Sequence, residues 1–293
     1  MTLTRVLPLS STALPAPPSG RTGWPWTEKT DPTLYDILPR GGWPKISIVC
    51  PSFQQGHFIE ETIRSVLLQN YPSLEFIIMD GGSTDGTGDI LKRYSPLFAH
   101  WGAQPDRGQS HALNKCCDLA TGDIIGWINS DDYYLPGAFA VVGRAYRAAP
   151  RSLIYGDWAL RQNEEPALSF HQEQPAFAFQ VAVGGRHLPS HATFWPRVAH
   201  QRINESLHFT MDAELFKRLA ASGWRPKYVN RPLAVCRSHP ASKTTRMLDV
   251  ARTETAAWSK AQPWHTAWRW RISRLVDRLR RAMTRVRLHF ASR

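Results

Sequence analysis

Two acidic residues, Asp131 and Asp132, stand side by side after an apolar run that ends in Trp127-Ile128. Two carboxylates this close repel each other and lose hydration when buried, so they need a cation or hydrogen-bond donors nearby. A divalent cation takes carboxylate oxygens as ligands and neutralises a diphosphate. Alternatively, an Asp here caps the helix predicted within 135–149. The residues alone favour neither interpretation.

A second polar segment, DGGSTDG at residues 80–86, also follows an apolar run. Gly, Ser and Asp are ordinary turn residues, so a plain loop is one interpretation. The other is close approach of the backbone to a nucleotide, with Asp80 accepting hydrogen bonds from a base or ribose. The segment lacks both the G-x-G-x-x-G spacing of a dinucleotide site and the G-K-[ST] of a P-loop. It therefore predicts a different nucleotide arrangement.

A third segment combines DRGQ at residues 106–109 with Asn114 and Lys115. It is either a surface loop followed by a solvated helix face, or a phosphate site. In a phosphate site Arg107 or Lys115 supplies positive charge, and the N-terminus of the helix adds its dipole.

Strand and helix patterns alternate along the first half of the chain, and the polar segments follow the strands. Apolar runs at 45–50, 71–80, 98–103 and 123–128 predict strands, and helical patterns occur within 59–67, 81–94, 108–120 and 135–149. This alternation, with continuously apolar strands, predicts a parallel α/β sheet. Ligands bind beyond the carboxyl ends of such strands. We therefore expect residues 51–52, 80–82, 105–108 and 129–132 to converge on one rim.

The alternation weakens after about residue 156. An extended segment at 186–198, a helix at 211–223 and a strand at 227–239 are predicted there. We interpret 45–245 as one domain and 246–293 as a basic helical tail. Residues 1–44 are rich in Pro and Ser and predict a flexible or draped extension.

The tail carries most of the formal net charge of +12, because residues 264–293 hold nine Arg and one Asp. Its apolar residues recur at three- and four-residue steps, which predicts a basic amphipathic helix. That helix either lies on an anionic membrane surface or packs on the domain. Nucleic acid is not expected as a partner, since no nucleic-acid motif accompanies the charge.

Composition limits the class of protein. With 42% hydrophobic and 20% charged residues the chain is typical of globular proteins, and no apolar run predicts a transmembrane helix. The first 20 residues lack the apolar core of a signal peptide, so we expect a cytoplasmic protein, peripheral on the inner face of the cell membrane if the tail binds there. The four cysteines have no metal-ligand spacing and are expected to be reduced core thiols.

Two long segments resemble the family 2 glycosyltransferases, which have the GT-A fold. They are ISIVCPSFQQGHFIEETIRSVLLQNYPSLEFIIMDGGSTDGTGDILKRY and PDRGQSHALNKCCDLATGDIIGWINSDD, with shorter matches at 155–157, 206–220 and 237–244. The resemblance covers roughly residues 45–245. It implies a Rossmann-type, mostly parallel sheet flanked by helices. It also implies inverting transfer of a sugar from a nucleoside-diphosphate donor to a carbohydrate or lipid-linked acceptor.

The resemblance also assigns roles to residues. Asp131 would bind a divalent metal, Mn²⁺ or Mg²⁺, on the donor diphosphate, with Asp132 and His239 beside it. Asp212 would be the general base, although from its residue type alone it is equally a carboxylate stabilised by a helix dipole. The expected nucleotide-sugar site consists of Pro51, Ser52, Asp80, Gly82, Arg107, Asn114, Asn129 and Asp131. A UDP-sugar is the expected donor.

The chain departs from the family pattern at a few positions. Asn129 and Gly81 replace usual acids, which puts the ribose contact and the base preference in doubt. Gln54, His111 and Cys116 are further departures. Two other functions stay open: a catalytically silent, membrane-associated glycan-binding or scaffold relative, and a nucleotidyltransferase.

Overall fold

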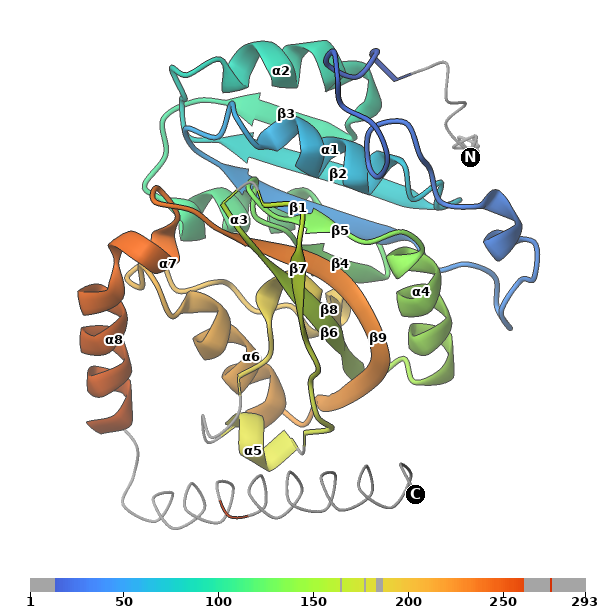
Figure 1. Cartoon of the computed structure of the whole chain (residues 1–293). Coiled ribbons are helices and arrows are strands. Elements are labelled where there is room, and N and C mark those ends of the chain that lie inside the picture. Colours follow the sequence, from blue (N-terminus) through green and yellow to red (C-terminus); the bar gives the residue numbers. More distant parts are fainter. Residues whose placement is uncertain (1–13, 164, 177, 183–186, 261–274, 276–293) are drawn as a thin grey trace, which may run out of the picture.

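The computed structural model describes residues 14–163, 165–176, 178–182, 187–260 and 275. Within them the strands form one nine-stranded sheet in the order β3-β2-β1-β4-β8-β6-β9-β5, with β7 paired to β6 (Figure 1). The strands are β1 Ile46–Ser52, β2 Leu74–Asp80, β3 His100–Ala103, β4 Ile124–Trp127, β5 Tyr133–Tyr134, β6 Ser152–Gln162, β7 Leu168–His171, β8 Thr193–Pro196 and β9 Arg225–Ser238. The α-helices are α1 Ile59–Leu67, α2 Thr87–Tyr94, α3 Gln109–Leu119, α4 Ala138–Ala148, α5 Ala178–Ala182, α6 Met211–Ala221, α7 Lys243–Arg246 and α8 Leu248–Lys260.

The first four strands run parallel, as the strand–helix alternation predicted. β1 pairs in parallel with β2 on one side and with β4 on the other, and β2 pairs in parallel with β3. Every residue of β1 is buried. Helices cover both faces of these strands, which is why their sequences are continuously apolar.

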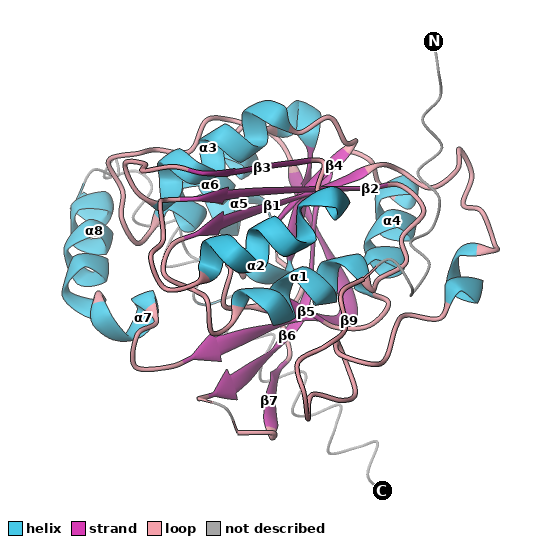
Figure 2. Cartoon of the chain, turned by 90° about the horizontal axis from the view of Figure 1, so that it is seen from above, coloured by secondary structure: helices cyan, strands magenta, loops and turns pink. Residues whose placement is uncertain are grey.

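Side chains alternate between the two faces and build two cores. Ile46, Ile48 and Cys50 of β1 pack into one core, whereas Val49 packs into the other. The first core receives α1, α2 and α4, and the second receives α3, α5 and α6. Figure 2 shows α1 and α2 on one face of β1–β3 and α3 and α6 on the opposite face.

The second half of the chain extends the same sheet with mixed pairing. β8 is antiparallel to β4 and to β6, whereas β6 and β9 are parallel. β5, directly after the Asp131-Asp132 turn, is antiparallel to β9. The predicted architecture, a mostly parallel α/β sheet flanked by helices, is confirmed.

Residues 14–44, the described part of the expected extension, are draped over the domain. The buried guanidinium of Arg64 donates to the carbonyls of Pro15, Pro25 and Trp26 at 2.6–3.1 Å. The Trp24 indole donates to the carbonyl of Tyr134 at 2.8 Å. The sequence left a flexible and a draped extension both open, because a Pro- and Ser-rich segment has no period that specifies its partners.

The expected tail begins at the last residue of α7 and continues with α8, which lies beside α6 (Figure 1). The basic amphipathic segment predicted over 264–293 lies outside the described residues except for position 275. No helix in the described part of the chain is both long and apolar enough to cross a membrane.

Candidate functional site

The carboxyl ends of the first strands meet at one rim, as expected. Ser52 at the end of β1 lies opposite Asp80 at the end of β2, and Asp80 lies opposite Ala103 at the end of β3. The amide of Gly81 donates to the Ser52 carbonyl at 2.8 Å. The turn after β4 carries Asp131 to the same rim, because β4 is parallel to β1.

Asp80 organises the loop that follows it. One carboxylate oxygen accepts from the amides of Gly82 and Ser83 at 3.1 and 2.8 Å, and the other accepts from the Ser83 hydroxyl at 2.7 Å. Gly82 has φ = +86°, a conformation that glycine adopts without strain. A Cβ at Gly81 would lie 3.1 Å from a carboxylate oxygen of Asp106, so an acidic side chain at position 81 would be crowded and repelled.

Side chains from α1 and β9 hold the turn that carries Asp131 and Asp132. The Thr62 hydroxyl of α1 donates to the carbonyls of Ser130 and Asp132 at 3.0 and 2.6 Å. The Arg237 guanidinium of β9 donates to the Asp131 carbonyl at 2.7 Å. The backbone between the two carboxylates is therefore rigid, and their side chains point to different neighbours.

Asp131 is at the open side of the turn, with 16% of its side chain exposed, and its carboxylate lies 3.2 Å from His239 Nε2. His239 is buried against the ring of Phe58, with ring centroids 4.4 Å apart. A carboxylate oxygen and an imidazole nitrogen at this distance converge on one point, and both are ligands that Mn²⁺ accepts. These two residues fit a divalent cation that takes its other ligands from a diphosphate and water.

Asp132 turns inward and is 2% exposed. Its carboxylate accepts from the amide of Arg237 at 2.8 Å and from the Asn129 side chain at 3.2 Å. Burial, together with the neighbouring charge of Asp131, raises the pKa of Asp132 to about 8. The adjacent acids that raised the first question thus have separate environments, one open to a cation and one buried.

A hydrogen-bond relay runs from this turn to the C-terminal elements. Asn129 accepts from Gln109 Nε2 at 2.8 Å and from the Trp127 indole at 2.9 Å. Gln109 in turn accepts from Lys243 of α7 at 2.5 Å. Asn129 is therefore held by protein groups, and the relay joins the start of α3 to α7.

Asp212 lies in the first turn of α6, partly buried. Burial raises the pKa of its carboxyl, while hydrogen bonds from the Ala213 amide and the Ser190 side chain and the charge of His187 oppose that rise. Burial also lowers the pKa of Lys243, and the charge of Asp212 counteracts this, so the two side chains are close enough to interact. Lys243, which donates to Gln109, thus senses the charge of Asp212.

Two of the predicted nucleotide-sugar residues have protein partners in this structure. Arg107 is exposed and forms an ion pair with Glu205 at 2.6 Å. Asn114 is 1% exposed; its amide donates to the Ile203 carbonyl and accepts from the Ile203 amide, at 2.9 and 2.8 Å. Asn114 therefore anchors the segment before α6. Pro51 and Ser52 end β1 at the rim, and the buried Ser52 hydroxyl has no hydrogen-bond partner among the described residues.

The family model for Glycosyl transferase family 2 matches residues 47–211. The chain belongs to this family. Its sheet is the α/β sheet of the GT-A enzymes.

Individual relatives agree with this assignment. The putative teichuronic acid biosynthesis glycosyltransferase TuaG of Bacillus subtilis is 37% identical over 92 residues, which is 30% of this chain and 36% of TuaG. The crystal structure of S. aureus TarS 1–349 superposes with a TM-score of 0.56 at 14% identity, covering 66% of this chain and 60% of that one. The mannosyltransferase PcManGT of Pyrobaculum calidifontis, in complex with GDP-Man and Mn²⁺, gives a TM-score of 0.51 at 20% identity, covering 78% and 64%.

The structure of this protein also brings together residues that the sequence did not connect. Gln109 and Lys243 lie inside segments that resemble the family, yet only the fold shows that they contact each other. His191 and Cys236 lie beside Asp132, with ligand atoms of all three within 4.8 Å of one another. These three positions are far apart in the sequence and form no motif, so no local signal predicts the cluster.

Proposed function

We propose that this glycosyltransferase transfers a sugar from a UDP-sugar to a hydroxyl of a glycan or lipid-linked acceptor, with inversion and with help from a divalent metal. The observation that carries the proposal is the pairing of Asp131 with His239 at the sheet rim. Inverting transfer needs one base and one group that absorbs the charge of the leaving diphosphate. We assign the base to Asp212 and the charge-absorbing group to a cation held by Asp131 and His239.

Asp212 is proposed as the general base. Its carboxylate takes the proton from the acceptor hydroxyl, and the resulting oxygen forms a bond to the anomeric carbon on the face opposite the diphosphate. The bond from that carbon to the phosphate oxygen breaks, and UDP leaves. A carboxyl whose pKa burial has raised is a stronger base than an exposed one, which suits this role.

Asp131 and His239 are proposed to hold Mn²⁺ or Mg²⁺. The ion would neutralise the negative charge on the leaving diphosphate. Asp132 supports the site through the rigid turn that it shares with Asp131 and Arg237. Asp80, Ser52 and Gly82 line the neighbouring strand ends and are proposed to face the nucleoside and its phosphates.

The choice of UDP rests on structural neighbours. TarS 1–349 was determined in complex with UDP and with UDP-GlcNAc, and these structures superpose with TM-scores of 0.54 and 0.52. A glycan or lipid-linked acceptor agrees with the net charge of +8 over residues 264–293, which would attach the enzyme to an anionic membrane on the cytoplasmic side.

Calorimetric binding of UDP tests the donor side of the proposal. We expect wild-type enzyme to bind UDP with Mn²⁺ and to lose at least about ten-fold in affinity with a chelator, because the cation bridges Asp131 and the diphosphate. Asp131→Ala should bind UDP weakly under both conditions. Asp118→Ala, an exposed acid on α3, is the matched control and should bind as wild type does. Equal UDP binding with and without metal would contradict the proposal.

A further inference from the structure

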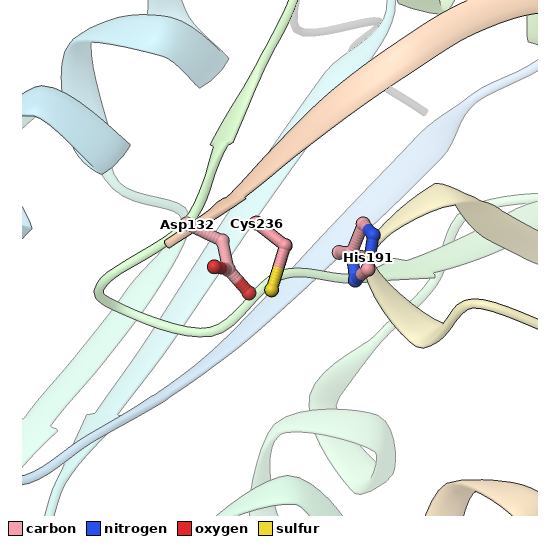
Figure 3. A group of neighbouring side chains, drawn as sticks. All are labelled: Asp132, His191 and Cys236. Carbon is pink, nitrogen blue, oxygen red and sulfur yellow. The ribbon is translucent and has the colours of Figure 1, made fainter. Parts of the chain in front are cut away.

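Three side chains from distant parts of the chain face one another next to the turn that carries Asp131 and Asp132. Asp132 comes from the turn after β4, His191 from the short helix Ser190–Ala192 before β8, and Cys236 from β9 (Figure 3). One ligand atom of each lies within 4.8 Å of the others, and this is the one such group of three in the described part of the chain. Carboxylate, imidazole and thiol form a mixed set of metal-binding groups.

His191 supplies an independent sign that a ligand belongs here. Its side chain is buried, with 9% exposure, and its Nε2 atom has no hydrogen-bond partner among the described residues. Trp158 packs edge-on against the ring at 5.1 Å and contributes no acceptor to it. Buried polar atoms are normally paired, so a lone imidazole nitrogen next to a thiol and a carboxylate calls for a further binding partner.

Cys236 differs from the other three cysteines of the protein. Cys50, Cys116 and Cys117 are fully enclosed in the two cores, whereas Cys236 is partly exposed. Its thiol contacts the Arg237 carbonyl weakly at 3.8 Å and hydrogen-bonds the side chain of Asp132. Burial raises the pKa of the Cys236 thiol and lowers that of His191 to about 4, so without a cation the pair is a neutral thiol beside a neutral imidazole.

We propose that Asp132, His191 and Cys236 bind one Zn²⁺ ion, with water as the fourth ligand. On binding, the Cys236 thiol releases its proton to solvent and its sulfur bonds to the metal, while the unpaired nitrogen of His191 donates its lone pair. The Asp132 carboxylate supplies an oxygen. Two anionic ligands then balance the charge of the ion in a buried setting.

The types of ligand atom distinguish this site from the Asp131–His239 pair. Thiolate and imidazole favour Zn²⁺, whereas carboxylate, phosphate and water suit Mn²⁺ and Mg²⁺. Zn–S and Zn–N or Zn–O bonds of about 2.3 and 2.0–2.1 Å place tetrahedral ligand atoms roughly 3.3–3.6 Å apart. The ligand atoms lie within 4.8 Å of one another, so they would move closer by roughly 1 Å on binding the ion.

A zinc ion here would join three segments of the glycosyltransferase. Asp132 adjoins Asp131, Cys236 adjoins Arg237, which holds the Asp131 carbonyl, and His191 adjoins Ser190, which hydrogen-bonds Asp212. The ion would therefore restrain both the proposed metal side and the proposed base side of the active site. Its role is structural, and it needs neither donor nor acceptor to bind.

Cobalt substitution tests the site directly. The full-length protein, stripped with a chelator, is titrated with Co²⁺ in the absence of nucleotide. We expect one equivalent to give the near-ultraviolet charge-transfer band of a thiolate–cobalt bond and the visible bands of tetrahedral cobalt, and Zn²⁺ to displace it. Zn²⁺ should also raise the midpoint of thermal unfolding, because it binds only the folded arrangement.

Substitutions show which side chains bind the metal ion. Cys236→Ser should abolish the charge-transfer band, and His191→Gln should weaken Zn²⁺ binding at least about ten-fold. Cys117→Ser and His239→Gln are matched controls and should keep the band. Asp131→Ala should keep it too while losing metal-dependent UDP binding, which separates failure of this site from failure of the proposed donor site.

A second measurement needs no variant. In wild-type protein, Zn²⁺ should protect Cys236 from alkylation, as read by mass spectrometry of the peptide that contains it. An absent charge-transfer band in the wild type, a band that survives Cys236→Ser, or alkylation of Cys236 at the same rate with and without Zn²⁺ would each overturn the proposal.

Discussion

At the scale of single residues, environment rather than residue type separates the acids of this enzyme. Asp131 and Asp132 are adjacent, yet one meets His239 at the rim and the other is buried with a pKa raised to about 8. Asp212, in the first turn of α6, is a third carboxyl with a raised pKa. Burial dominates both shifts, because a desolvated carboxylate is destabilised relative to its neutral form.

Replacing Asp212 tests its role as base. Asp212→Asn keeps the size and a hydrogen-bonding oxygen but cannot take a proton, so we expect kcat to fall about 10²- to 10⁴-fold. The KM for the UDP-sugar should change less than about three-fold, since the donor side is untouched. Steady-state release of UDP measures both constants.

Glu214→Gln is the control for this substitution. Glu214 lies in the same helical turn, but its carboxylate pairs with Arg218 at 2.6 Å. It should retain nearly full kcat. If Asp212→Asn and Glu214→Gln lose activity equally, the base lies elsewhere.

At the scale of elements, α8 holds the start of α6. Glu254 of α8 accepts hydrogen bonds from the amides of His208, Phe209 and Thr210 at 2.7–3.1 Å and from the Thr210 hydroxyl at 2.9 Å. Burial opposes ionisation of Glu254, but these donors outweigh it and lower the pKa of its carboxyl. One carboxylate thus fixes the segment that leads directly into Asp212.

Glu254→Gln should loosen this junction, because an amide has one acceptor oxygen where the carboxylate has two. We expect a loss of about 1–2 kcal/mol in unfolding free energy. A several-fold drop in kcat with unchanged UDP affinity should accompany it. Chemical denaturation and steady-state kinetics measure the two effects.

Asp249→Asn, an almost fully exposed position on α8, is the matched control. It should change neither quantity. An unchanged kcat in Glu254→Gln would show that α6 keeps its position without the Glu254 carboxylate of α8.

At the scale of the whole molecule, the end of the sheet opposite the rim is tied together by Glu75. Its buried carboxylate accepts from Lys45 and Ser47 next to and within β1, and from the amide and hydroxyl of Thr121 after α3, at 2.5–2.8 Å. Burial alone would raise the pKa of Glu75, but these hydrogen bonds outweigh it and lower the pKa to about 2.

Because the folded pKa of Glu75 lies below its ordinary value of 4.5, its stabilisation is present above about pH 4.5 and is lost as the pH falls toward 2. Glu75→Gln should therefore lower the unfolding free energy by about 2 kcal/mol at pH 7. The difference from wild type should shrink as the pH falls below 4.5. Urea denaturation at several pH values measures it.

Glu28→Gln, at an exposed position in the draped segment, is the control and should match wild type at every pH. A difference between Glu75→Gln and wild type that stays constant from pH 7 to pH 3 would contradict the assignment of this effect to Glu75 ionisation.

The sequence by itself determined the parallel half of the sheet and the polar rim at the carboxyl ends of its strands. Continuous apolar runs separated by helical periods specify parallel strands, and a polar segment after each strand places Asp80 and Asp131 at the same edge. These are local signals, since each depends on a few neighbouring residues. The family resemblance extended the same kind of signal to Asp212 and His239.

Only the tertiary structure decided which polar groups meet. Asn114 anchors Ile203 and Arg107 pairs with Glu205, and the sequence did not predict either contact with the segment before α6. The cluster of Asp132, His191 and Cys236 has no sequence signature, because its members come from three elements that the sheet brings together. Side-chain partners depend on how distant strands pair, and residue types along the chain do not encode that pairing locally.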